Sequence, residues 1–150
     1  MSVWIRESIA GFPVTITFHA LGMAFLVGIN FTLDLRVLGV APRLSLALIE
    51  KFYPLMWVSF VTALVSGLLL LLAYPAKGLT NIVFYTKMLI IVAALVLTRI
   101  LTVQLIRNGS AISGTHKLLA LASILLWVLV ITLGRFLAYT YTILLTTDFY

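Results

Sequence analysis

Four apolar stretches, each long enough to cross a bilayer, dominate this sequence. They occupy residues 13–35, 54–74, 82–105 and 118–146, and charged or turn-forming residues separate them. A transmembrane helix needs about 20 predominantly apolar residues. Because the hydrocarbon core offers no water to backbone groups, each stretch satisfies them as an α-helix. The sequence therefore predicts an all-α integral membrane four-helix bundle, built as a single transmembrane domain over residues 1–150.

The composition excludes most soluble functions. Hydrophobic residues make up 63% of the chain and charged residues 9%, whereas soluble domains average about 45–50% and about 25%. Cysteine is absent, which excludes thiolate catalysis, iron–sulfur clusters and covalently attached c-type haem. The net charge of +6 comes from single Lys and Arg residues rather than a basic run, so we expect no nucleic-acid partner. The chain also has no glycine-rich phosphate loop and no paired catalytic carboxylates.

Positive residues predict the orientation, because short cytoplasmic loops retain Lys and Arg. Six of them flank the connection between the first two stretches and the connection between the last two: Arg36, Arg43, Lys51, Arg99, Arg107 and Lys117. Both termini should therefore face the periplasm of a bacterium, with the chain as a multi-pass protein in its inner (cytoplasmic) membrane. The first residues lack the basic segment of a cleaved signal peptide, and we expect none.

An amphipathic segment precedes the second stretch. Leu44, Leu48, Ile49 and Phe52 recur at helical spacing before Pro54. This pattern predicts a short interfacial helix, separate from the membrane span that begins at Pro54.

Three basic residues fall at one depth in the outer half of the predicted bundle. His19 lies about 9 Å into the first stretch at 1.5 Å per residue, Lys87 lies near the start of the third, and Arg135 lies in the outward half of the fourth. No Asp or Glu is predicted at this depth, so the three groups should repel one another unless an anionic group sits among them or some are neutral. Because ionisable groups in a bilayer are costly, this unneutralised layer is the strongest functional signal in the sequence.

Two further polar residues share faces with this layer. Asn30 lies on the helical stripe of His19, and Thr98 lies on the stripe of Lys87, so both are candidate cofactor contacts. Small residues on the second and fourth helices predict close helix packing, and they would also leave room for a flat ligand.

The cytoplasmic end contains both signs of charge. Asp34 has Arg36 and Arg99 as candidate partners for an ion pair that locks the helix ends, and a proton or anion route through this layer is the alternative. His116 begins the fourth stretch, roughly 20 Å from His19 along the membrane normal. The two histidines therefore cannot ligate one iron, and we interpret His116 as a residue of the helix start.

One b-type haem would explain the outer layer. A neutral imidazole ligates haem iron well, which makes His19 a candidate axial ligand. Lys87 would offer a lone pair if desolvation removed its proton, and Arg135 suits a haem propionate because a guanidinium pairs with a carboxylate through two hydrogen bonds. Alternatives without a cofactor stay open: His19 bonded to an interhelical carbonyl, with Lys87 and Arg135 extending to the interface.

Each of the four stretches also carries a motif. The motifs are His19-Ala-Leu-Gly-Met-Ala-Phe-Leu-Val-Gly28 with Asp34-Leu-Arg-Val-Leu-Gly39, Ser66-Gly-Leu-Leu-Leu, Phe84-Tyr-Thr-Lys-Met-Leu, and Ser123-Ile-Leu-Leu-Trp127 with Gly134-Arg-Phe-Leu-Ala-Tyr139. In this order they resemble a family of small four-helix bacterial inner-membrane proteins whose shared domain has no assigned function.

The placement of His19 and Lys87, early in the first and third helices, also resembles protoporphyrinogen oxidases of the HemJ type. The copper-resistance D-like membrane proteins are similar in helical layout. The resemblance to the oxidases implies a b-type haem with His19 and Lys87 as axial ligands of its iron. It leaves open whether this chain is an enzyme.

Three functions fit these observations. The first is a membrane protein that binds haem b in its outer-leaflet half and transfers electrons, with a quinone or a periplasmic redox protein as partner. The second is a transport or channel component for an anion or a metal. The third is a non-catalytic anchor subunit, within a homo-oligomer or a larger membrane complex.

Overall fold

A computed structural model describes residues 11–107 and 112–139 of the chain. Their helices are α2 (Gly11–Leu38), α3 (Leu46–Ala73), α4 (Pro75–Leu79), α5 (Ile82–Arg107) and α6 (Gly114–Tyr139). Within these ranges there is no β-strand. All but the short α4 are long and apolar enough to span a membrane. The all-α fold with four spanning helices, predicted from the sequence, is therefore confirmed, and the chain has the form of a multi-pass membrane protein.

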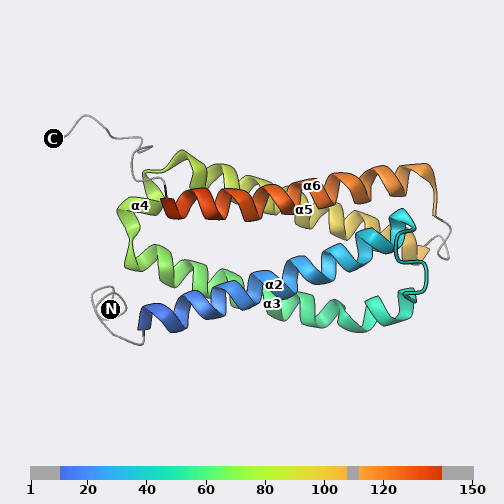
Figure 1. The fold of residues 1–150 in the computed structure, drawn as a ribbon, viewed down its shortest axis with the longest axis horizontal. Coiled ribbons are helices and arrows are strands. Elements are labelled where there is room, and N and C mark those ends of the chain that lie inside the picture. The colour runs from blue at the N-terminus through green and yellow to red at the C-terminus, as the bar shows by residue number, and fades with distance from the viewer. Residues whose placement is uncertain (1–10, 108–111, 140–150) are drawn as a thin grey trace.

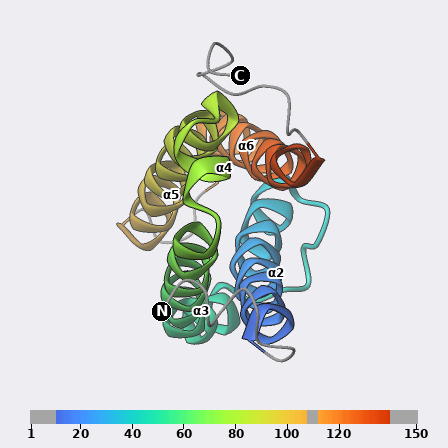
Figure 2. The same ribbon diagram turned by 90° about the vertical axis from the view of Figure 1, so that its left-hand side faces the viewer.

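The bundle consists of two helix pairs. α2 packs along α3, α5 packs along α6, and contact between α2 and α6 joins the pairs (Figures 1 and 2). α4 connects α3 to α5 at the end where α2 begins and α6 finishes (Figure 1). We call this the α4 end. α2 is thus the helix that contacts both its own partner and the other pair.

The two pairs separate toward the α4 end (Figure 1). Among the described side chains, the buried residues of α2 begin at Gly22 and those of α6 end at Val130. The first turns of α2 and the last turns of α6 therefore contribute little to the common core.

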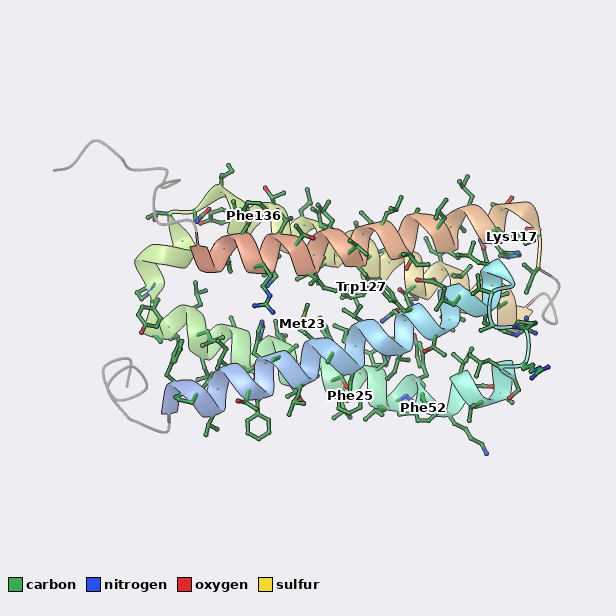
Figure 3. The ribbon with its side chains drawn as sticks, in the orientation of Figure 1. Met23, Phe25, Phe52, Lys117, Trp127 and Phe136 are labelled. Atoms are coloured by element: carbon green, nitrogen blue, oxygen red, sulfur yellow. The ribbon has the colours of Figure 1, made fainter. Side chains whose placement is uncertain are left out.

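The core consists of two apolar clusters stacked along the bundle. The first core cluster lies nearer the α4 end and contains Leu26, Val27, Met56, Ala94, Trp127 and Val130. The second core cluster contains Leu33, Val37, Ile49, Leu101, Leu105 and Ala120. Trp127 lies between the two helix pairs (Figure 3). The outward faces carry exposed apolar side chains, such as Phe18 and Leu89, that suit contact with lipid.

α3 is longer than the sequence predicts, and the separate interfacial helix is not formed. Ser45 caps the helix by accepting a hydrogen bond of 3.2 Å from the backbone N–H of Leu48, and α3 then continues through Pro54 to Ala73. Proline removes one helical hydrogen bond. Ile49 and Met56, seven residues apart, are nevertheless both buried, so packing on either side of Pro54 keeps the helix continuous.

The other helix limits follow the predicted stretches closely. α2 ends where Gly39 takes a positive φ of 84°, a conformation that glycine adopts readily after a helix. α5 covers the third stretch, and α6 covers the fourth as far as Tyr139. Residues 140–146 of that stretch lie outside the described residues.

The closest approach of α2 to α3 depends on Gly22. A Cβ atom at this position would lie 2.8 Å from the backbone nitrogen of Ala63 and 3.0 Å from the carbonyl oxygen of Ser59. We therefore expect Gly22→Ala to destabilise the bundle by about 1–3 kcal/mol, since α3 would have to move away. Thermal unfolding in detergent, followed by circular dichroism, measures this effect.

Gly28→Ala is the matched control, because a Cβ atom there would meet nothing within 4 Å. This variant should leave stability unchanged or raise it by up to about 1 kcal/mol through helix propensity. Equal melting temperatures for the two variants would contradict the close α2–α3 contact.

Candidate functional site

His19 projects from α2 onto a patch of small residues on α3. Its Nδ1 lies 2.9 Å from the carbonyl oxygen of Ala63 and 3.2 Å from Oγ of Ser66. Since a carbonyl oxygen only accepts, we infer that Nδ1 carries the proton and donates to it. Nε2 is then the nitrogen with a free lone pair, and His19 makes no other hydrogen bond within the described part of the chain.

The sequence alternative in which His19 bonds an interhelical carbonyl is therefore confirmed, and it does not compete with metal binding. Histidines that ligate metals usually donate their second ring N–H to a carbonyl or carboxylate, which fixes the tautomer and the ring orientation. The contact with Ala63 is a bond of this kind.

Gly67 leaves the space that the imidazole needs. A Cβ atom at Gly67 would lie 3.1 Å from Cε1 of His19 and 3.4 Å from Nδ1. The small residues of α3, which the sequence predicts as a packing stripe, thus also seat this ring.

Lys87 is the buried cation of α5. Asn81 positions the start of α5, because its Oδ1 accepts a hydrogen bond of 2.9 Å from the N–H of Val83. The Lys87 side chain is 9% exposed and runs against α6, where a Cβ atom at Gly134 would lie 3.4 Å from Nζ. In the described ranges Lys87 has neither a hydrogen bond nor an ion pair.

The structure brings His19 and Lys87 into one region at the α4 end. The two side chains lie within electrostatic range of each other. Arg135 follows Gly134 directly on α6, and its side chain is exposed. Of the two described acidic residues, Asp34 lies near the end of α2 and Glu50 near the start of α3, both away from the α4 end. Among described residues, the basic layer therefore lacks a carboxylate.

Asn30 and Thr98 do not belong to this region. Each lies eleven residues beyond its predicted neighbour, Asn30 after His19 and Thr98 after Lys87, which is about 16 Å along a helix. Both are buried between the two core clusters. They share a layer with each other but not with the basic groups.

Asp34 differs from its predicted role as an ion-pair partner. The residue is buried, and its Oδ2 has no hydrogen-bond partner. Arg36 instead donates from Nε to the carbonyl oxygen of Leu44 at 2.6 Å, and Arg99 is exposed. The predicted charge pairing at this end is therefore wrong, because Arg36 points along the connection and Arg99 away from the core.

His116 is confirmed as a residue of a helix start. Its Nδ1 accepts a hydrogen bond of 3.0 Å from the backbone N–H of Ser113, which directly precedes α6. This bond ties the imidazole to the local turn.

Ser123 and Trp127 are buried polar residues that sequence reasoning assigned only to packing or to a motif. Ser123 Oγ and Trp127 Nε1 have no hydrogen-bond partner. Their spacing of four residues on α6 was the available signal, because it places both side chains on one helix face.

No family model, curated protein or solved structure matches the chain.

His19 should also contribute to stability through its contact with α3. We expect His19→Ala to lower the free energy of unfolding by about 1 kcal/mol, the usual scale of one interhelical hydrogen bond in a membrane protein. The measurement is thermal unfolding in detergent.

The matched control is Thr32→Ala, because the exposed Thr32 hydroxyl donates at 2.8 Å to Gly28 of its own helix. This change should be close to neutral. Equal losses in the two variants would mean that the Ala63 contact contributes nothing specific.

Proposed function

We propose that this chain is a bacterial inner-membrane protein that binds one b-type haem at the α4 end and takes part in electron transfer. The observation that carries the proposal is the bond from His19 Nδ1 to the Ala63 carbonyl, which leaves Nε2 available for iron. A neutral histidine in this tautomer is a common axial ligand of haem.

The neighbouring residues fit the same group. Lys87 would be the second residue to hold the iron, since it is buried, lies within electrostatic range of His19 and has no acidic partner among the described residues. Arg135 is exposed one position beyond the glycine that Lys87 approaches, where its guanidinium could pair with a propionate. Asn30 and Thr98, earlier candidate contacts, lie too deep to share this site.

Each protein group has a separate task in this proposal. When bound, the haem supplies one-electron redox chemistry. Ala63 holds the imidazole in one tautomer and orientation, and Gly67 leaves room for the ring. A quinone in the bilayer or a periplasmic redox protein is the proposed partner, because the α4 end would lie in the outer leaflet.

Absorption spectroscopy tests the haem. The purified protein, supplemented with haemin in mild detergent, should show a Soret band and a reduced-minus-oxidised α-band. His19→Ala should remove these bands. Lys87→Ala should retain haem but change the spin state of its iron, as measured by electron paramagnetic resonance. Arg135→Ala should weaken haem binding by roughly ten- to a hundredfold, the scale of a lost charged contact.

His116→Ala is the control, since its ring is bonded to Ser113 at the opposite end of the bundle, and its spectrum should equal that of the unchanged protein. If the unchanged protein binds no haem, or if His19→Ala retains the full spectrum, the proposal fails. Anion flux into liposomes that is lost in Lys87→Ala would then favour the transport function.

The proposed orientation has its own test, since the natural chain lacks cysteine. Leu79→Cys at the α4 end and Glu50→Cys near the other end place single thiols at exposed positions. A membrane-impermeant maleimide should label Leu79→Cys in intact cells with a permeabilised outer membrane. Glu50→Cys should react only after the inner membrane is opened, and the reverse pattern would invert the topology.

A further inference from the structure

Several buried polar groups lie near the level where the two core clusters adjoin. Five of their atoms have no hydrogen-bond partner: Asn30 Oδ1, Asp34 Oδ2, Thr98 Oγ1, Ser123 Oγ and Trp127 Nε1. Their side chains come from α2, α5 and α6, and each is at most 3% exposed. Unsatisfied buried polar atoms are rare in proteins, and each calls for a cause.

The positions of the clusters place these groups at similar heights along the bundle. On α2, Asn30 lies between Leu26 of the first core cluster and Leu33 of the second. On α5, Thr98 lies in the same way between Ala94 and Leu101.

α6 also carries a polar residue between members of the two core clusters. Ser123 lies between Ala120 of the second core cluster and Trp127 of the first. The Asp34 carboxyl group lies beside the Ser123 hydroxyl, although neither Asp34 Oδ2 nor Ser123 Oγ has a hydrogen-bond partner of normal geometry. We call Asn30, Asp34, Thr98 and Ser123 the oxygen layer.

The two hydroxyls of the oxygen layer depart from the pattern of the bundle. Helical Ser and Thr side chains commonly donate to the carbonyl four residues earlier. Nine described residues do so here: Thr15, Thr17, Thr32, Ser59, Thr62, Ser66, Thr86, Thr102 and Thr132. Thr98 and Ser123 do not, so their oxygens are not engaged by their own helices.

The side-chain oxygen of Asn30 is also left without a hydrogen bond. Nδ2 of Asn30 donates to the carbonyl oxygen of Leu26 at 2.6 Å, which leaves Oδ1 as the free atom. The oxygen layer therefore combines one carboxylate, one amide oxygen and two hydroxyl oxygens.

Among the described side chains, neither Arg36 nor Arg99 supplies a positive partner to this donor set. Arg36 is bonded to Leu44 and Arg99 is exposed, and an ionised carboxylate buried without a counter-charge is strongly unfavourable. Hard cations prefer oxygen ligands of these types. A single carboxylate favours an ion of single charge, and the described residues hold no cluster of three or more His, Cys, Asp or Glu that would suit a transition metal.

We propose that the oxygen layer is a binding site for one monovalent metal cation of the size of Na⁺. Asp34 supplies the charge, Asn30, Thr98 and Ser123 supply neutral oxygens, and Trp127 Nε1 donates to a water molecule that completes the coordination. The site lies about 16 Å from the haem region along the helices and does not depend on it.

Thermal unfolding in detergent tests this site, because a ligand that binds only the folded state stabilises it by an amount that grows with the logarithm of the ligand concentration above the Kd. NaCl is compared with choline chloride at equal ionic strength. We expect the melting temperature of the unchanged protein to rise with the logarithm of the Na⁺ concentration, and no rise in Asp34→Asn, which has nearly the same shape. Thr98→Val should shift this rise to a roughly three- to tenfold higher Na⁺ concentration, as expected for one lost neutral ligand.

Glu50→Gln, which removes an exposed carboxylate of α3, is the control and should keep the full response. The haem spectrum of Asp34→Asn should be unchanged, so failure of one site leaves the other testable. An equal melting temperature in NaCl and choline chloride for the unchanged protein would overturn the proposal. A response to pH alone that Asp34→Asn removes would also overturn it, since the occupant would then be a proton.

Discussion

The absence of water from the hydrocarbon core is the constraint on which this structure depends. Every backbone group must be satisfied within its own segment, so the chain forms four long helices with short connections. The same rule applies to side chains, and most hydroxyls of the bundle follow it by donating to their own helix. Polar groups that break this rule therefore stand out against a uniform apolar background.

α2 integrates the bundle because it contacts both α3 and α6. Toward the α4 end it approaches α3 so closely that Gly22 cannot carry a Cβ atom without displacement, and there it seats His19 against small residues. Further along, the same helix turns Asn30 and Asp34 into the core shared with α5 and α6. One helix thus contributes to two polar regions of different chemistry, one basic and one made of carboxylate, amide and hydroxyl oxygens.

The fold was predictable from the sequence to a large extent, while the sites were predictable only in part. The length of each apolar stretch predicts a membrane-spanning helix. Counting residues along these helices places Lys87 and His19 at one depth. The counts could not show that Asn30 and Thr98 belong to a separate layer, nor that Arg36 bonds Leu44 instead of Asp34. The continuity of α3 could not be read from the sequence either, because a proline predicts a helix boundary. In the structure, packing of Ile49 and Met56 on either side of Pro54 keeps the helix continuous.

The sequence by itself determined that the chain is a four-span membrane protein with few charges and a basic layer at one depth, since hydropathy and helical rise are local properties. Only the tertiary structure decided which nitrogen of His19 is bonded, where Lys87 packs, and that four buried oxygens of α2, α5 and α6 lack hydrogen-bond partners among the described residues. These features depend on how α2, α3, α5 and α6 are rotated and paired. That choice is made by the fit of small and large side chains across the helix contacts, which are distant in the sequence.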